Sequence, residues 1–142
     1  MNRLVFIAAV SLILVMVFAQ GMRSSSAEGA ATYFINLKDG DSVKSPVLVQ
    51  FGLKGMGIAP AGIEFENTGH FHLLIDQDEN VLEMNLPLPT TDNIRHFGKG
   101  QTEGMLELTP GTHSLQILLA DFSHIPHDPA IMSEKLTIAV TE

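Results

Sequence analysis

The chain has 142 residues, a formal net charge of −8 at pH 7 and no cysteine. The lack of cysteine excludes disulfides, thiolate zinc sites, thiol nucleophiles and lipids attached to an N-terminal cysteine. The acidic excess argues against nucleic acid as a partner, because phosphate backbones are bound by clustered lysine and arginine.

The chain begins with a short segment that contains the basic residue Arg3, and an apolar run follows from Leu4 to Ala19. Small residues offer two cleavage positions, so residues 1–27 are predicted to be a secretory signal peptide, cut after residue 27 or after residue 19. The run is slightly shorter than a typical membrane span, which leaves an uncleaved anchor as the alternative. We therefore expect a periplasmic or secreted protein that meets a membrane only transiently, through this leader.

Residues 28–142 are predicted to form a single domain built from short strands. Turn residues separate seven apolar segments, at residues 32–37, 47–53, 70–75, 81–84, 101–108, 113–120 and 135–140. No segment keeps a helical period over three turns. This pattern predicts an all-β fold, an immunoglobulin-like antiparallel sandwich of about seven strands that lacks the Cys and Trp signature of antibody domains.

Two histidines stand one residue apart in the stretch GHFHLLID, at His70 and His72. Side chains alternate along a strand, so both imidazoles point to one face while Phe71 points to the other. Neutral imidazole is the commonest metal-binding side chain, and a pair on one face can share an ion. The alternative is that both line the exposed face of a strand whose other face fills the core.

The loops at residues 55–69, 85–100 and 121–133 fall at one end of the sandwich if successive strands run antiparallel. These loops contain or adjoin five of the six histidines, and we predict all five as metal ligands: His70, His72, His96, His124 and His127. The position of His96 depends on residues 81–84 being a strand. His113 alternates in phase with apolar residues, so we expect it to be half-buried, hydrogen-bonded and outside the site.

The choice of metal depends on the donors near this end. Imidazole nitrogen suits copper and zinc alike. Met56 and Met132 lie in or beside the same loops, and their soft sulfur favours copper if either coordinates, although methionines more commonly fill gaps in a core. Copper is therefore the expected ion, and zinc is the alternative.

Motifs spread along the domain carry a family resemblance. They are FGLKGMGIAPAG at residues 51–62, Thr68-Gly69-His70 with the following HLLID, HFG with GQTE at residues 96–103, and HIPHDP at residues 124–129 with Met132-Ser133. In these the chain resembles the bacterial exported family catalogued as domain of unknown function 4399. Members of that family usually read Gly-His-His-His where this chain has Phe71, which implies that the middle imidazole is dispensable. The resemblance implies export and supports the histidine motifs, but it supplies no mechanism.

We expect a periplasmic metal-binding module for metal storage, sensing or delivery. One alternative is a metal-dependent periplasmic enzyme in which Glu66 or Glu103 acts as the base. Another is a non-catalytic module that binds protein or glycan through the same loops. The sequence contains no Gly-x-Ser-x-Gly elbow, phosphate-binding loop or dinucleotide fingerprint.

Overall fold

The computed structural model describes residues 23–142, so most of the predicted signal peptide lies outside the described residues. The elements, in chain order, are β1 (Ala31–Phe34), β2 (Ser42–Lys44), β3 (Val47–Lys54), β4 (Gly57–Ile58), β5 (Thr68–Ile75), the 3-10 turn η1 (Glu79–Val81), β6 (Ile94–His96), β7 (Glu103–Leu106), β8 (Gly111–Ala120) and β9 (Leu136–Thr141). No helix in this part of the chain is long and apolar enough to cross a membrane.

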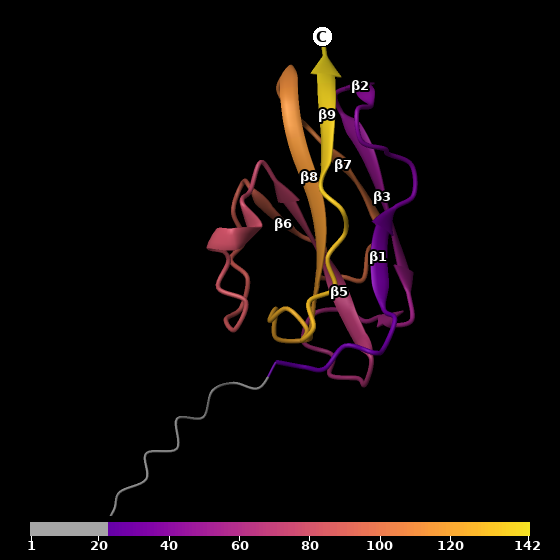
Figure 1. Cartoon of the computed structure of the whole chain (residues 1–142), viewed down its shortest axis with the longest axis vertical. Coiled ribbons are helices and arrows are strands. Elements are labelled where there is room, and N and C mark those ends of the chain that lie inside the picture. Colours follow the sequence, from indigo (N-terminus) through magenta and orange to yellow (C-terminus); the bar gives the residue numbers. More distant parts are fainter. Residues whose placement is uncertain (1–22) are drawn as a thin grey trace, which may run out of the picture.

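The strands form two sheets that pack face to face as an immunoglobulin-like sandwich (Figure 1). The smaller sheet has the order β1-β3-β7, with both pairs antiparallel. The larger sheet has the order β2-β9-β8-β5-β4, and β6 also pairs with β5. Strands β4 and β6 share one edge of β5, at its beginning and near its end respectively, while β8 occupies the other edge.

The main core lies between the two sheets and follows the alternation of side chains along each strand. Strand β5 contributes Phe71, Leu73 and Ile75, and β8 contributes the residues opposite them in register. The remaining inward-facing residues of the long strands are Val47, Val49, Phe51, Leu136, Ile138 and Val140. Apolar burial of this extent provides the main free energy of folding in a chain without disulfides.

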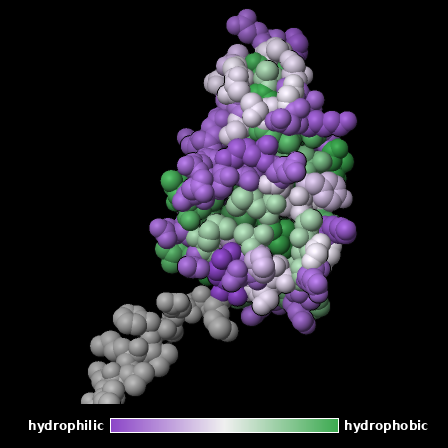
Figure 2. Space-filling model, viewed as in Figure 1, coloured by the Kyte–Doolittle hydropathy of each residue, from purple (hydrophilic) through white to green (hydrophobic). Residues whose placement is uncertain are grey.

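The outer face of the larger sheet is also covered. Residues 76–93 leave the end of β5, form η1 and lie against this face beside β8 (Figure 1). Leu88 of this excursion packs with Leu118 and Ala120 of β8, and Leu82, Met84 and Met132 surround them. In the view of Figure 1, apolar and polar residues are mixed on the molecular surface (Figure 2). Strand β5 is therefore buried on both faces, which explains why apolar residues such as Leu73 and Leu74 point to opposite faces near its end.

The predicted all-β sandwich is confirmed, but the prediction of a strand at residues 81–84 is wrong. The chain forms the single turn η1 there, with the Asp78 side chain accepting a hydrogen bond from the Asn80 amide, and then continues without a strand. The short strands β2, β4 and β6 were not predicted, because each has only two or three residues. Strand β6 matters most for function, since it carries His96 back along β5.

Candidate metal centre

Strand β5 places His70 and His72 on the outer face of the larger sheet. His70 stands opposite Ala120 of β8 and His72 opposite Leu118. The two side chains are 0% and 1% exposed, so they do not line an open strand face as in the alternative considered from sequence. They lie beneath the covering loops, next to the small apolar cluster around Leu118.

Strand β6 brings in His96. It pairs antiparallel with β5, and the pairing sets His96 directly opposite His72. The His96 ring then lies over Gly98, where a Cβ atom would come within 2.1 Å of the ring carbon Cε1. His96 thus reaches the predicted neighbourhood through a strand that the sequence pattern did not predict, in place of the strand at residues 81–84.

His124 comes from the loop that follows β8. Hydrogen bonds to the Asp121 carboxylate from the Ser123 amide, the Ser123 hydroxyl and the Ile125 amide fold this loop tightly. His124 sits at the bend with φ +69°, a left-handed conformation that costs a residue with a Cβ about 1 kcal/mol or more. The amide of Leu88 donates to the His124 carbonyl at 2.8 Å, which joins this loop to the covering excursion.

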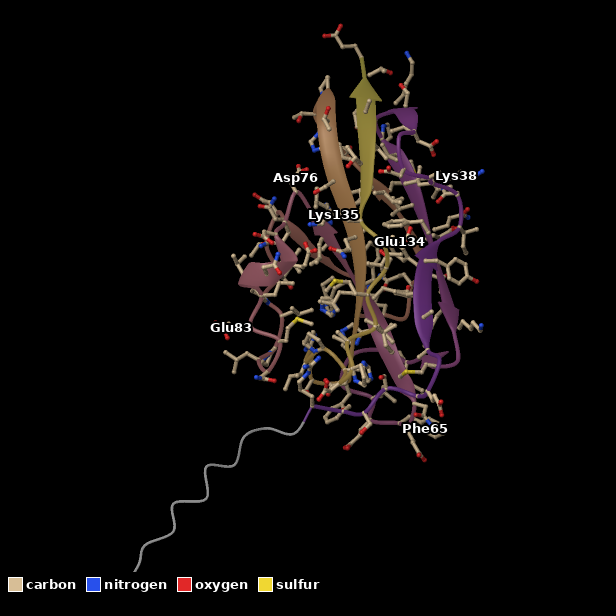
Figure 3. The ribbon with its side chains drawn as sticks, in the orientation of Figure 1. Lys38, Phe65, Asp76, Glu83, Glu134 and Lys135 are labelled. Atoms are coloured by element: carbon tan, nitrogen blue, oxygen red, sulfur yellow. The ribbon has the colours of Figure 1, made fainter. Side chains whose placement is uncertain are left out.

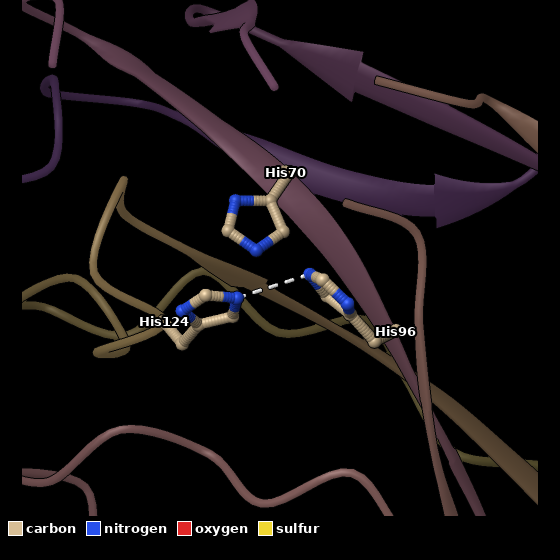
Figure 4. A group of neighbouring side chains, drawn as sticks. All are labelled: His70, His96 and His124. Atoms are coloured by element: carbon tan, nitrogen blue, oxygen red, sulfur yellow. Dashed lines mark hydrogen bonds between the residues drawn. The ribbon is translucent and has the colours of Figure 1, made fainter. Parts of the chain in front are cut away.

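The four imidazoles converge. Every pair of rings among His70, His72, His96 and His124 has centroids between 4.7 and 5.9 Å apart. Nitrogen atoms of His70, His96 and His124 all lie within 4.8 Å of one another. Figure 4 shows one His70 nitrogen directed toward the two facing nitrogens of the other rings, the Nε2 atoms, which are 3.1 Å apart.

The inner pair of rings has no hydrogen-bond partner. Both ring nitrogens of His70 and both of His72 are buried and unpaired. Leaving a buried polar atom unpaired costs about 1–3 kcal/mol, so such groups are rare without a function or a missing ligand. This arrangement is unexpected for a purely structural histidine pair.

The cluster also favours uncharged rings. Burial, followed by the neighbouring rings of His124 and His96, lowers the pKa of His70 to about 4. Burial and the adjacent His70 ring lower the pKa of His72 to about 2, and burial together with His124 lowers the pKa of His96 as well. These three rings therefore present lone pairs, which metal binding requires, at neutral pH.

The domain of unknown function DUF4399 matches residues 49–141 of the chain. The chain belongs to the DUF4399 family. The match runs from β3 to β9 and includes all four converging histidines, so the family resemblance inferred from the motifs is confirmed. No curated protein and no solved structure matches the chain.

His127 of this DUF4399 protein, also predicted as a ligand, lies outside the four-ring cluster. Its Nε2 atom donates to the backbone carbonyl of Thr68 at 3.1 Å, and its ring packs against Gly69. The methionines considered as soft ligands belong to apolar clusters: Met56 packs against the main core and Met132 against the small cluster around Leu118. The converging donors are thus all imidazole nitrogens.

His113 of the DUF4399 protein lies apart from the cluster, at the end of β5 marked by Asp76 in Figure 3. Its two ring nitrogens face the Asp76 carboxylate at 2.7 Å and the Thr109 carbonyl at 2.8 Å. Both partners are acceptors, so the arrangement stabilises the doubly protonated ring. The hydrogen bond to Asp76 accordingly raises the pKa of His113, and the residue is half-buried and hydrogen-bonded as expected.

The carboxylates proposed as catalytic bases lie elsewhere. Glu103 is on the exposed face of the smaller sheet, where it accepts a hydrogen bond from Gln50 at 2.8 Å. The main core separates it from the histidines, which are on the outer face of the other sheet. Glu66 is exposed and lines a pocket at the end of the sandwich where Phe65 projects (Figure 3).

Sequence reasoning missed the contribution of residues 23–26, which it assigned to the leader. The Ser24 hydroxyl donates to the Asp121 carboxylate at 2.7 Å, and the Arg23 guanidinium donates to the carbonyls of Pro126, at 2.9 Å, and His127. Backbone hydrogen bonds also join Ser24 and Ser26 to Asp128. In this DUF4399 protein the N-terminal segment therefore holds the loop that carries His124, and no local sequence signal marks it for that role.

Proposed function

We propose that this protein is a metal-binding module that holds a transition-metal ion, copper or zinc, through His70, His72, His96 and His124. The observation that carries the proposal is the convergence of four imidazoles whose inner pair is buried without any hydrogen-bond partner. A metal ion takes up one lone pair from each ring and thereby relieves part of the cost of burying them.

The backbone at His124 supports the same proposal. Glycine is the residue that best tolerates a left-handed backbone conformation. The chain nevertheless has a histidine at position 124 and directs its ring toward His70 and His96. Strain of this kind concentrates at functional sites, where the surrounding structure maintains it for the sake of the side chain. Asp121 and its three loop hydrogen bonds supply that support.

The proposed biological role is storage, sensing or delivery of the ion in the periplasm or outside the cell. Imidazole donors suit copper, zinc and nickel. The uncharged state of the buried rings keeps them available at neutral pH. The export signal predicted in residues 1–27 supports a location in the periplasm or outside the cell.

Calorimetric titration of copper and zinc ions into metal-free, untagged protein tests the proposal. We expect one ion to bind per chain, and the double variant His70→Ala, His124→Ala to bind at least about a thousandfold more weakly, because two of four donors are lost. The matched control is His113→Ala, which removes a histidine outside the cluster and leaves the affinity unchanged. Equal affinity in the double variant and the wild type contradicts the proposal, and a protein or glycan ligand for these loops then becomes the better explanation.

A further inference from the structure

The four ring centres of the histidine cluster form a nearly regular tetrahedron. Five of the six centroid separations fall between 4.7 and 5.1 Å, and the sixth, between His72 and His124, is 5.9 Å. Four rings at the corners of a square would instead give two diagonal separations about 1.4 times the edges. The rings are therefore arranged in three dimensions around a common centre.

The size of this tetrahedron fits a single small ion. With a metal–nitrogen distance of about 2.1 Å and each ring centre about 1.1 Å beyond its nitrogen, tetrahedral coordination separates the ring centres by about 5.2 Å. The same geometry separates the ligand nitrogens by about 3.4 Å, and the Nε2 atoms of His96 and His124 are 3.1 Å apart. The nitrogens of His70, His96 and His124 already lie within 4.8 Å of one another, and the His72 ring must turn about its side-chain bonds to bring one of its nitrogens to the same ion.

The fourth coordination position lies next to a fourth imidazole ring. A catalytic zinc site has three protein ligands and keeps the fourth position for water or substrate. Here the His72 ring stands beside that position: its centroid is 4.8 Å from that of His70 and 5.1 Å from that of His96. The His72 side chain is 1% exposed and opposite Leu118. The outer rings, His96 and His124, are partly exposed, so the ion enters from their side and becomes enclosed by the inner pair.

We infer that these four histidines form a closed, all-nitrogen tetrahedral site for a d10 ion, zinc(II) or copper(I), which rests on the proposed metal-binding function. A d10 ion has no ligand-field preference against a tetrahedron, whereas copper(II) prefers square-planar or tetragonal surroundings. Four protein ligands hold an ion without offering it to a substrate. The site therefore stores or carries the ion, and the enzyme alternative loses its open coordination position.

Cobalt(II) reports the geometry directly, because tetrahedral cobalt(II) absorbs visible light far more strongly than six-coordinate cobalt(II). We expect cobalt-loaded wild-type protein to show the intense tetrahedral bands. In His72→Ala the bands should weaken and shift as water replaces the ring. Zinc affinity should also fall by more than about a hundredfold, since even changes to groups that merely support ligands cost up to that much. His127→Gln, outside the four-ring cluster, is the matched control and should keep both the spectrum and the affinity.

The outcomes separate this inference from the function on which it rests. Cobalt that binds with only weak, six-coordinate bands overturns the tetrahedral site but leaves metal binding intact. Strong bands that are unchanged in His72→Ala overturn the role of His72 as the fourth ligand. A copper(II) complex whose electron paramagnetic resonance spectrum is plainly tetragonal also overturns the inference. Failure of cobalt(II), zinc(II) and copper(I) to bind at all overturns the proposed function itself.

Two further titrations distinguish the d10 ions. Zinc(II) competes against a chromogenic zinc chelator, and copper(I), kept reduced, competes against a chromogenic cuprous chelator. Tight binding of either ion supports the closed tetrahedral site and identifies the ion by its higher affinity. Binding of copper(II) alone, with neither d10 ion retained against its chelator, overturns the inference.

Discussion

The Nε2 atoms of His96 and His124 face each other at 3.1 Å across the histidine cluster. One of these atoms must carry a proton and donate it to the other, because two bare lone pairs at this distance repel. A metal ion at the cluster needs both lone pairs. The metal-free and metal-bound proteins must therefore differ in the position of a ring proton.

This relationship predicts a change of tautomer on metal binding. Without metal, one of the two rings is protonated at Nε2; with metal, both rings should be protonated at Nδ1 and should coordinate through Nε2. Long-range ¹H–¹⁵N correlation spectra of the histidine rings distinguish the two tautomers. Ring shifts of His96 and His124 that stay unchanged after an equivalent of zinc would count against coordination by these atoms.

The left-handed backbone of His124 predicts opposite effects on stability and binding. Replacement by glycine, His124→Gly, removes strain of about 1 kcal/mol, so the metal-free protein should unfold at the same or a slightly higher temperature. The increase in melting temperature on adding metal should be much reduced, because a ligand is lost. Differential scanning calorimetry with and without zinc measures both.

Asn67 provides the control for this glycine substitution. It too has a positive φ, +54°, but lies outside the histidine cluster. Asn67→Gly should also leave the metal-free protein at least as stable as the wild type, although asparagine tolerates this conformation better than histidine. It should retain the full stabilisation by metal. A strong loss of metal-free stability in His124→Gly alone would show that the ring is needed for packing.

The lowered pKa values predict that the metal-free protein loses stability as the pH falls below about 6.5. Between pH 6.5 and about 4 the unfolded chain binds a proton at His70 that the folded chain does not, and for His72 this range extends to about 2. Stability is thus fully present above 6.5, and each ring contributes a slope of up to about 1.4 kcal/mol per pH unit below it. Urea unfolding at several pH values measures this slope, which should be smaller in His72→Leu.

His113 should produce the opposite dependence. Its raised pKa means that its hydrogen bond to Asp76 stabilises the folded state at low pH and that this contribution is lost as the pH rises through the raised value. His113→Asn should therefore reduce stability more at pH 6 than at pH 9. Identical pH profiles for His113→Asn and the wild type would contradict the assigned charge state.

Much of the fold could be predicted because it depends on alternation along long strands. Phe71, Leu73 and Ile75 indicated the core face of β5 directly, and the same alternation placed His70 and His72 together. The position of His96 was predicted for the wrong reason. Strand β6 has only three residues, and a segment that short contains too few alternations to be recognised, so its pairing with β5 appears only in three dimensions.

The burial of the inner histidines could not be predicted from the sequence. The histidines were expected together at the loop end of the sandwich, with His70 and His72 on one face of a strand, but these two lie under a covering layer that residues 76–93 and 121–133 build together. That layer depends on contacts between segments distant along the chain. Likewise, the sequence could not separate His127 from His124, which are three residues apart, because a single hydrogen bond to Thr68 and a left-handed turn decide which ring faces the cluster.

Gly98 predicts a way to disturb the metal site without removing a ligand. An added methyl group at this position would lie 2.1 Å from Cε1 of the His96 ring and 2.4 Å from its Nε2, so Gly98→Ala should push the ring away from the cluster. We expect metal affinity to fall about ten- to a hundredfold, as for other changes that misplace a ligand. Gly57→Ala is the matched control, because its nearest new contact is an ordinary 3.4 Å. Equal affinities for the two variants would place His96 outside the metal site.

The N-terminal segment at residues 23–26 predicts where the mature chain begins. Cleavage after residue 27 would remove the Arg23 and Ser24 side chains that hold the His124 loop, whereas cleavage after residue 19 would keep them. We therefore expect intact mass and N-terminal sequencing of exported protein to give Gln20 as the first residue. A chain shortened to begin at residue 28 should bind metal about tenfold more weakly, because the loop must then be ordered on binding.

The variant Arg23→Ala separates this effect from truncation in general. It keeps the chain length and the Ser24 hydroxyl but loses the donors to the carbonyls of Pro126 and His127. Amide hydrogen exchange in residues 122–128 should become faster in this variant, while exchange in the core of β8 should not change, because the Arg23 side chain donates its hydrogen bonds to the loop. A mature chain that starts at residue 28 and binds metal as tightly as the longer form would show that the loop holds His124 in place by itself.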